Sequence, residues 1–283
     1  MPELPEVETV MRGLAPVWEG QRFTRVVANR PDLRRPLPEA LGQRLTGAVA
    51  TRLGRRAKYG LVETDRGDTL IVHLGMSGRM RVDPGELLKH DHVVFETANG
   101  RTVAFNDARR FGSLDLVPTA DVAAHPLIAN IGPEPLGAEF GLALLKRIFD
   151  GRLAPAKAIL LDQRLIAGLG NIYVCEALFR AGIHPETPGA RVTPAQLALL
   201  SPAIPAVLRE AIVAGGSTLR DHAAPDGTLG YFQKDFAVYG REGAACAACA
   251  TPVARIVQSG RSSFFCPACQ PQGQQRRAGR TKA

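Results

Sequence analysis

Four cysteines near the C-terminal end of the chain constrain its fold more than any other feature. Cys246 and Cys249 form one pair, Cys266 and Cys269 form a second, and sixteen residues separate the pairs. This spacing is typical of a zinc site built from four thiolates. Two disulfides are the alternative, but no secretory segment precedes the chain's first helix, so we expect a reducing compartment. We therefore predict one structural Zn2+, because four cysteine ligands leave no position open for a substrate.

The residues between the two cysteine pairs predict a short hairpin. Arg255–Val257 and Ser263–Phe265 have the composition of strands, and residues 258–261 join them. Arg261 would then lie at the tip of the hairpin, where its side chain could contact a phosphate. The fifth cysteine, Cys175, falls in a predicted helix and is interpreted as a free core thiol.

Chain length, hydrophobic content and net charge indicate the class of protein and the kind of partner to expect. The chain has 283 residues, enough for two domains, and 45% of them are hydrophobic, as in a globular protein. No apolar run approaches the ~18 residues of a membrane span. A net charge of +8 and a pI near 9.6 favour a polyanionic partner, although a basic protein that is merely soluble is the alternative.

The order of expected elements predicts an α+β multidomain protein. We expect an N-terminal helix with a buried apolar stripe formed by Val7, Val10, Met11 and Leu14. A β-rich region from Gln21 to Pro118 follows it and suggests a two-sheet sandwich or barrel. Its expected strands include Arg22–Val27, Leu61–Glu63, Leu70–Leu74, Leu114–Val117, and a hairpin of Val93–Thr97 with Arg101–Phe105 around Asn99-Gly100. Prolines and glycines then mark a linker, after which the expected helices are Leu142–Asp150, Ala156–Asp162, Ile172–Ala181 and two more within Pro194–Ala214.

The first residues of the chain carry the most chemistry. If the initiator methionine is removed, Pro2 presents a free secondary amine. Because an α-amino group titrates near ~7.7–8.0 and a lysine near ~10.4, such an amine is more often neutral and nucleophilic. Glu3 and Glu6 flank the start of the helix and could lie close to that nitrogen. The alternative is that they only complement the helix dipole.

Several other motifs suggest contacts with phosphates or bases. Gly168–Asn171 would bring an anion to a helix N-terminus, with Lys157 in reach, although Asn171 could also simply cap the helix. Residues 55–59 form a basic cluster that is either a solvated face or a phosphate contact. Met76 and Phe111 lie in glycine-bearing turns, where apolar side chains beside cations can wedge apart a base step, although each alone is more often ordinary packing.

Taken together, these segments resemble the formamidopyrimidine-DNA glycosylases, bifunctional enzymes that excise oxidised purines such as 8-oxoguanine. The matching segments occur in order over nearly the full chain: PELPEVE, RRAKY, HLGMSG, ARRFG, GPEPL, GLGNIYVCEALF, AGIHP and the four cysteines. Leu4 resembles this branch more than the endonuclease VIII branch, which prefers oxidised pyrimidines and usually has glycine there.

The resemblance implies the fold and the domains. It implies an N-terminal helix with a two-sheet β-sandwich, a helix-two-turn-helix domain and a C-terminal zinc finger β-hairpin. We place the catalytic domain at residues 2–124 and a linker at 125–137. The DNA-binding domain would cover 138–231 with a lesion loop at 217–230, followed by the zinc finger at 232–271. We expect a basic, disordered tail at 272–283, which is longer than usual in the family.

The resemblance also implies roles for individual residues. It makes Pro2 the nucleophile at the sugar C1′ and Glu3 the proton donor to the ring oxygen, with Glu6, Lys58 and Arg261 completing the catalytic group. The residues expected to contact DNA are His73, Met76, His92, Arg109, Phe111, Lys157 and Asn171. Successive β- and δ-elimination would then cut the strand at the damaged sugar.

These inferences define the expected function. We expect a monomeric, cytoplasmic base-excision-repair enzyme that acts on damaged double-stranded DNA and has no membrane partner. Two alternatives stay open, namely a glycosylase of the same fold for oxidised pyrimidines and a DNA-lesion binder without catalytic activity. Intact Pro2, Glu3 and Lys58 count against the binder, which would need no processed N-terminus.

Overall fold

The computed structural model of the protein describes residues 2–217, 224–228 and 230–272. Its contacts divide the chain into two compact units. The first contains Met1–Glu139, Gln163–Gly170 and Pro205–Asp235, and the second contains Phe140–Asp162, Asn171–Ile204 and Phe236–Ala283. Residues 273–283 of the predicted tail and half of the predicted lesion loop, residues 218–223 and 229, lie outside the described residues.

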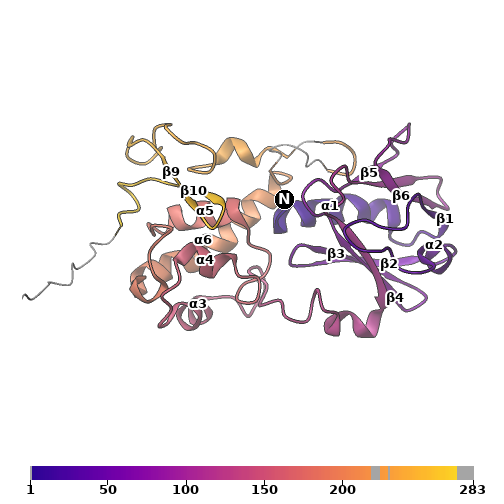
Figure 1. The fold of residues 1–283 in the computed structure, drawn as a ribbon, viewed down its shortest axis with the longest axis horizontal. Helices are drawn as coiled ribbons and strands as arrows, with labels where there is room; N and C mark the ends of the chain where they lie inside the picture. The colour runs from indigo at the N-terminus through magenta and orange to yellow at the C-terminus, as the bar shows by residue number, and fades with distance from the viewer. Residues whose placement is uncertain (1, 218–223, 229, 273–283) are drawn as a thin grey trace, which may run out of the picture. The chain divides into compact units, whose positions relative to one another are not determined.

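The first unit begins with helix α1 (Leu4–Trp18), which the sequence places there for two local reasons. Pro5 occupies the first turn, where its missing N–H costs no hydrogen bond, and the Glu6 carboxylate accepts a hydrogen bond from the Glu3 backbone N–H at 2.8 Å. The predicted apolar stripe is confirmed, since Val7, Val10, Met11 and Leu14 are all buried. In Figure 1, α1 runs beside strands β2 and β3.

Two antiparallel four-stranded sheets follow α1. One has the order β1 (Phe23–Ala28), β6 (Asp91–Thr97), β7 (Thr102–Asn106) and β5 (Arg79–Val82). The other has the order β2 (Ala50–Arg56), β3 (Tyr59–Thr64), β4 (Asp68–His73) and β8 (Ser113–Pro118). One hydrophobic core contains residues of both sheets and of α1, so the predicted helix and two-sheet domain is confirmed. Short elements complete this unit: α2 (Leu41–Leu45), η1 (Thr119–Ala124) and η3 (Phe232–Asp235).

Strand register determines which side chains meet at one end of the second sheet. Arg56 pairs with Tyr59, so Ala57 and Lys58 form the turn between β2 and β3. Tyr59 in turn pairs with His73 on β4, and the two rings lie 4.9 Å apart. Lys58, Tyr59 and His73 are therefore held at the same end of the sheet by backbone pairing.

The predicted hairpin around Asn99-Gly100 is confirmed, with one difference in its turn. Gly100 has the expected positive φ of +78°, whereas Asn99 does not. The Asn99 side chain instead accepts a hydrogen bond of 2.7 Å from the Thr97 hydroxyl. The turn therefore depends on one glycine and one side-chain acceptor.

The second unit contains most of the helices. They are α3 (Leu142–Phe149), α4 (Ala156–Leu161), α5 (Asn171–Arg180), η2 (Gly189–Arg191) and α6 (Pro194–Val213), whose last residues belong to the first unit. The prediction of two helices within Pro194–Ala214 is wrong, because α6 is continuous despite its internal prolines. Leu200, Ile204 and Val207 lie on one buried stripe along it, and this burial outweighs the local disruption by proline.

Helix α6 is also the one described helix that is long and apolar enough to meet a membrane-span criterion. Its sequence includes Arg209 and Glu210 near the C-terminal end. The stripe of Leu200, Ile204 and Val207 is fully buried within the protein. We therefore interpret α6 as a core helix.

The second unit ends in the predicted zinc hairpin, which is confirmed. Strands β9 (Ala254–Gln258) and β10 (Arg261–Phe265) pair in antiparallel register, and Gln258 faces Arg261. Ser259 and Gly260 have φ of +49° and +75°, as a two-residue hairpin turn that matches the strand twist requires. Strand β10 packs on α5 (Figure 1).

Candidate active site

The start of α1 is a buried acidic site. Pro2 is buried, and Glu3 and Glu6 are only 4% and 2% exposed. Besides the Glu3 N–H, the Glu6 carboxylate accepts a hydrogen bond of 2.9 Å from the Ser217 N–H. Glu6 therefore connects the first residues of the chain to the beginning of the segment after α6. The structure thus brings together Pro2, Glu3 and Glu6, the three residues expected to share one site.

Two glycines pack directly against this site. The Leu4 N–H donates to the Gly168 carbonyl at 3.1 Å, and a Cβ on Gly168 would lie 2.6 Å from the Leu4 side chain. A Cβ on Gly170 would lie 2.2 Å from the Glu3 carboxyl carbon. The sequence suggested an anion site for this motif, but no local pattern revealed that its glycines make room for Glu3 and Leu4.

Lys58 lies in the turn between β2 and β3 and is only 8% exposed. It lines a cavity of about 320 Å³ together with Tyr59 and His73. The rest of the lining comes from the segment after η1 and from the residues just before Gly168: Pro126, Leu127, Asn130, Ile131, Gln163 and Arg164. A lysine, an arginine and a histidine around one cavity suit an anionic group such as a phosphate.

His73 is neutral at physiological pH in this setting. Burial lowers its pKa to about 4, and the nearby charges of Lys58, Arg34 and Arg35 act in the same direction. A neutral imidazole has one donor and one acceptor nitrogen. His73 can therefore contact a phosphate or a sugar by hydrogen bonding without adding a charge.

Two loops carry the residues expected to enter the DNA. Met76 and Phe111 are 41% and 39% exposed, and the Arg109 guanidinium lies 4.8 Å from the centre of the Phe111 ring. Gly75 has φ +63°, and a Cβ there would lie 2.3 Å from the Phe111 backbone carbon. Because Gly75 has no side chain, the loop that carries Met76 can pack directly against the backbone of the loop that carries Phe111.

Asp107 joins these two loops, and no sequence pattern pointed to it. It is fully buried and accepts hydrogen bonds from the Ser77 hydroxyl at 2.5 Å and from the Gly112 N–H at 2.7 Å. The Arg109 N–H also donates to it at 3.2 Å. Because the carboxylate holds groups from both loops, it fixes the relative positions of Met76, Arg109 and Phe111.

His92 has a different environment from that expected of an exposed DNA contact. It is 5% exposed, and its Nε2 shares a hydrogen bond of 2.8 Å with the Asp107 carbonyl. The ring of His90, which the sequence analysis did not select, lies 6.0 Å from that of His92 and is half-buried. The DNA contact assigned to His92 stays a prediction.

In the second unit, Asn171 and Lys157 converge on one backbone carbonyl. The Asn171 amide and the Lys157 ammonium donate to the Ser262 carbonyl at 2.8 and 3.0 Å. The ammonium also contacts the Ser263 hydroxyl at 2.5 Å and is 2% exposed. Both side chains therefore hold strand β10 of the zinc hairpin to the helices, in addition to any role at a phosphate.

Arg261 is exposed at the hairpin tip, as predicted. It lines a cavity of about 300 Å³ with Lys157, Gln258 and Ser259. The buried Glu176 of α5 accepts hydrogen bonds from the backbone N–H groups of residues 237–239. Sequence reasoning missed Glu176, because its partners lie about sixty residues away along the chain.

The four predicted zinc ligands form one cluster. The Sγ atoms of Cys246, Cys249, Cys266 and Cys269 all lie within 4.8 Å of one another. Four thiolates at this separation fit a tetrahedral Zn2+, for which Zn–S bonds are about 2.3 Å long. Cys175 lies apart from them, buried in α5.

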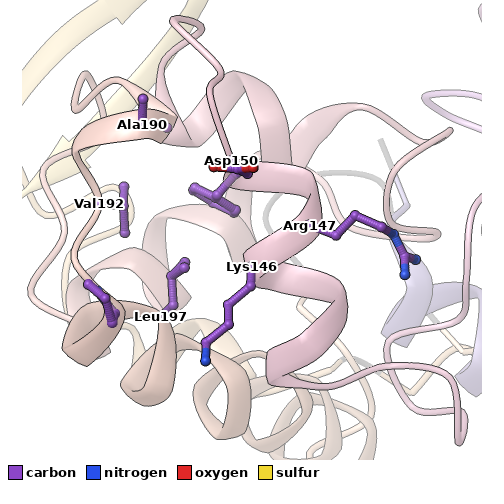
Figure 2. A pocket seen from close by; sticks show the side chains of 9 residues that line it. Lys146, Arg147, Asp150, Ala190, Val192 and Leu197 are labelled. Carbon is purple, nitrogen blue, oxygen red and sulfur yellow. The ribbon is translucent and has the colours of Figure 1, made fainter.

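A further pocket of about 500 Å³ lies in the second unit between α3, η2 and the start of α6. Figure 2 shows the side chains of Lys146 and Arg147 extending in different directions from α3. None of the predicted site residues lines this pocket. It is therefore separate in composition from the candidate active site.

Comparison with known proteins identifies the family. Residues 1–114 match the family model of the formamidopyrimidine-DNA glycosylase N-terminal domain, and residues 131–223 match that of its H2TH domain. Residues 243–272 match a zinc finger found in FPG and IleRS. A formamidopyrimidine-DNA glycosylase of Novosphingobium aromaticivorans is 62% identical over 95% of this chain and 100% of its own. The chain belongs to the formamidopyrimidine-DNA glycosylase family.

Other members of this family are similar over the same extent. The formamidopyrimidine-DNA glycosylase of Caulobacter vibrioides is 55% identical, again over 95% of this chain and 100% of its own. The crystal structure of MutM (Fpg) from Thermus thermophilus has a TM-score of 0.85 at 41% identity and covers 96% of this chain and 100% of that one. A Lactococcus lactis Fpg bound to DNA containing an abasic site has a TM-score of 0.88 at 36% identity, over 95% and 100%.

These findings confirm the predicted family, fold class and enzyme class. They also confirm one structural zinc site, since both the zinc finger match and the four-thiolate cluster fall on the predicted cysteines. Solved relatives were crystallised with damaged DNA, including a carbocyclic 8-oxo-G in one MutM complex with a TM-score of 0.87. The roles of individual site residues are inferred below.

Proposed function

We propose that this glycosylase removes oxidised purines, such as 8-oxoguanine and formamidopyrimidines, from duplex DNA and then cleaves the strand. The observation that carries the proposal is the start of α1, where Pro2, Glu3 and Glu6 share one buried site. A secondary amine beside a buried carboxyl supplies both a nucleophile and a proton donor. The names of similar proteins support the substrate class.

Pro2 is the proposed nucleophile once Met1 has been removed. Its nitrogen lone pair forms a bond to C1′ of the damaged nucleotide while the bond from C1′ to the base breaks. The base leaves with the proton that the proline nitrogen releases. Glu3 donates a proton to the ring oxygen, so the sugar opens and the nitrogen becomes part of a charged iminium. The Glu6 carboxylate holds Glu3 in place by accepting a hydrogen bond from the Glu3 backbone N–H.

The iminium makes strand cleavage possible without a redox cofactor. Its positive charge acidifies the C2′ proton, and loss of that proton expels the 3′ phosphate in a β-elimination. A δ-elimination then expels the 5′ phosphate. Lys58 and His73, which line one cavity, are placed to bind the phosphate and sugar next to the damaged base.

Met76, Arg109 and Phe111 are proposed to fill the space left by the flipped nucleotide. Flipping a base costs a few kcal/mol, because stacking and pairing are lost. The exposed Met76 and Phe111 side chains can replace part of that stacking. Arg109 can donate hydrogen bonds to the acceptors of the unpaired cytosine.

The second unit is proposed to bind the DNA backbone. Arg261 at the hairpin tip and the amide of Asn171 would contact phosphates beside the lesion, with Lys157 nearby. Zinc, when bound to the four thiolates, supplies a structural cross-link that holds the hairpin in place. In the first unit, His92 is proposed to contribute to DNA binding from its buried position beside Asp107.

The proposal extends to the setting in which the enzyme acts. We assign residues 2–124 to catalysis, 138–231 to DNA binding and 232–271 to the zinc finger, joined by the linker at 125–137. We infer a monomer that acts on damaged double-stranded DNA in the bacterial cytoplasm. The net charge of +8 and the bacterial relatives support this setting.

Borohydride trapping tests the substrate class. Reduction should convert the iminium to a stable adduct with 8-oxoguanine duplex DNA, and Pro2→Gly should reduce the trapped fraction severely. The same assay with 5-hydroxycytosine should trap far less protein. Preferential trapping on 5-hydroxycytosine would indicate a pyrimidine-directed glycosylase instead. Binding without any adduct would indicate a lesion-binding protein without catalytic activity.

A further inference from the structure

The turn that carries Lys58 has an unusual backbone conformation. Ala57, the residue before Lys58, has φ +52° and is 1% exposed. An L-residue other than glycine loses roughly 1–2 kcal/mol in this left-handed region. Because alanine has no side-chain hydrogen bond to offset this cost, the surrounding structure must hold the turn.

Glu134 supplies that support from the segment after η1. One carboxylate oxygen, Oε1, accepts hydrogen bonds from the Ala57 backbone N–H at 2.5 Å and from Arg56 Nη1 at 2.9 Å. The other oxygen accepts one from Arg55 Nη1 at 2.9 Å. Arg55 Nη1 also donates to the Ala57 carbonyl at 2.8 Å. Both backbone polar groups of Ala57 are therefore bonded to this cluster.

The cluster is itself anchored on several sides. Arg56 donates to the carbonyls of Ile131 and Gly132, each at 2.7 Å. Arg55 donates to Glu8 of α1 at 3.0 Å. Although burial raises the pKa of Glu8, hydrogen bonds from Arg12 and Arg55 lower it below its usual value.

Charge and burial both favour a fixed geometry here. The side chains of Arg55 and Glu134 are 9% and 23% exposed, so their ion pair is better shielded than a surface pair. Three arginines, Arg12, Arg55 and Arg56, pair with the two carboxylates of Glu8 and Glu134, so each carboxylate has two cationic partners. Pro133 and Pro135 flank Glu134 and restrict its backbone.

We propose that Glu134 is a positioning residue for Lys58. Its carboxylate holds Ala57 in the left-handed conformation, and the turn then presents Lys58 to the cavity shared with Tyr59 and His73. This inference rests on the proposed function, in which Lys58 acts on the damaged nucleotide. The GPEPL segment contributed to the family resemblance, and the structure assigns a role to its acidic residue.

A rescue experiment tests the proposal. Glu134→Ala should lower the single-turnover rate of 8-oxoguanine excision by about 10- to 100-fold, since small displacements of a reacting group have effects of this size. Glu134→Gln keeps one acceptor for the Ala57 N–H but places an NH2 group where the second oxygen accepts from Arg55, so it should lose less but still several-fold. Adding Ala57→Gly to Glu134→Ala should recover several-fold of the loss, because glycine adopts positive φ without support.

The controls separate this mechanism from lost stability and from failure of the proposed function. Asp68→Asn removes a similarly shielded carboxylate, paired with Arg44 at the opposite end of β4, and should leave excision unchanged. An unchanged rate in Glu134→Ala, or no recovery with Ala57→Gly, would overturn the role of Glu134. If Glu134→Ala does not fold, Glu134→Gln alone decides, and wild-type rates in that variant overturn the proposal. If the wild-type enzyme itself fails to excise or to form an adduct, the proposed function fails instead.

Discussion

The zinc hairpin of the second unit and the start of α1 in the first unit each serve the proposed function and are held in place by different means. The hairpin is built from neighbours in sequence, with register set by the Ser259-Gly260 turn and its end closed by four cysteines. The start of α1 depends on distant residues, since Gly168, Gly170 and Ser217 all contact its first residues. Local patterns therefore predicted the existence of the two strands, their connection and the four cysteines of the hairpin. For α1 they predicted the chemistry of its first residues but not the distant residues that pack against them.

Zinc removal should give the largest effect and concerns the hairpin alone. Structural zinc contributes about 10–16 kcal/mol of folding free energy in small zinc modules, so the hairpin should unfold without it. Cys249→Ser or chelation should then weaken DNA binding on the order of a hundredfold, about 3 kcal/mol. Fluorescence anisotropy measures the loss of DNA affinity, and metal analysis of the same samples measures the loss of zinc.

The matched control for zinc removal is Cys175→Ala, which removes a buried cysteine outside the cluster. It should keep one zinc ion per chain and near-normal affinity. Full DNA affinity in zinc-free protein would contradict the role of the hairpin.

Gly170→Ala should give the next largest effect and concerns the α1 site. The new Cβ would lie 2.2 Å from the Glu3 carboxyl carbon, so Glu3 must move. Excision should fall by about 100-fold while binding of damaged duplex persists, because a displaced catalytic group affects the reaction more than binding. Single-turnover kinetics and a binding titration separate the two quantities.

Gly54→Ala provides the comparison for that variant. Gly54 lies in β2, and no atom lies within 4 Å of a Cβ placed there. Its excision rate should stay near the wild-type value. Equal losses in both variants would mean that Gly170 has no special relation to Glu3.

His73 should give the smallest effect near neutral pH, because its effect on stability appears only on acidification. Its folded-state pKa of about 4 lies below the ordinary value of 6.5, so the unfolded chain takes up a proton first on acidification. The stability that the buried, neutral His73 contributes is fully present above pH 6.5. It is lost as the pH falls towards 4, by up to about 3 kcal/mol. His73→Gln should reduce the pH dependence of the unfolding free energy between pH 6.5 and pH 4, which denaturant titrations at several pH values measure.

His125→Gln is the matched control, because it removes a half-buried imidazole just after η1. Its stability should follow pH as the wild-type enzyme does. An unaltered slope in His73→Gln would show that the burial of His73 does not act on stability.

The sequence was sufficient where spacing determines structure. It predicted the buried stripe of α1, most strands of the two sheets and the zinc ligands, because each follows from a local period or spacing. It could not reveal Glu134 or Glu176, which accept hydrogen bonds from backbone N–H groups 77 and 62 residues away in the chain. Nor could it reveal Asp107, which links the Ser77 hydroxyl to the Gly112 N–H. It also predicted a break in α6, because local proline signals do not report the burial that keeps that helix continuous.

The most direct test of the central claim is to locate the trapped adduct within the protein. After borohydride reduction and trypsin digestion, mass spectrometry should find the sugar remnant on the N-terminal peptide that begins at Pro2 and ends at Arg12. An adduct on the peptide that carries Lys58, or on protein that retains Met1, would contradict the account.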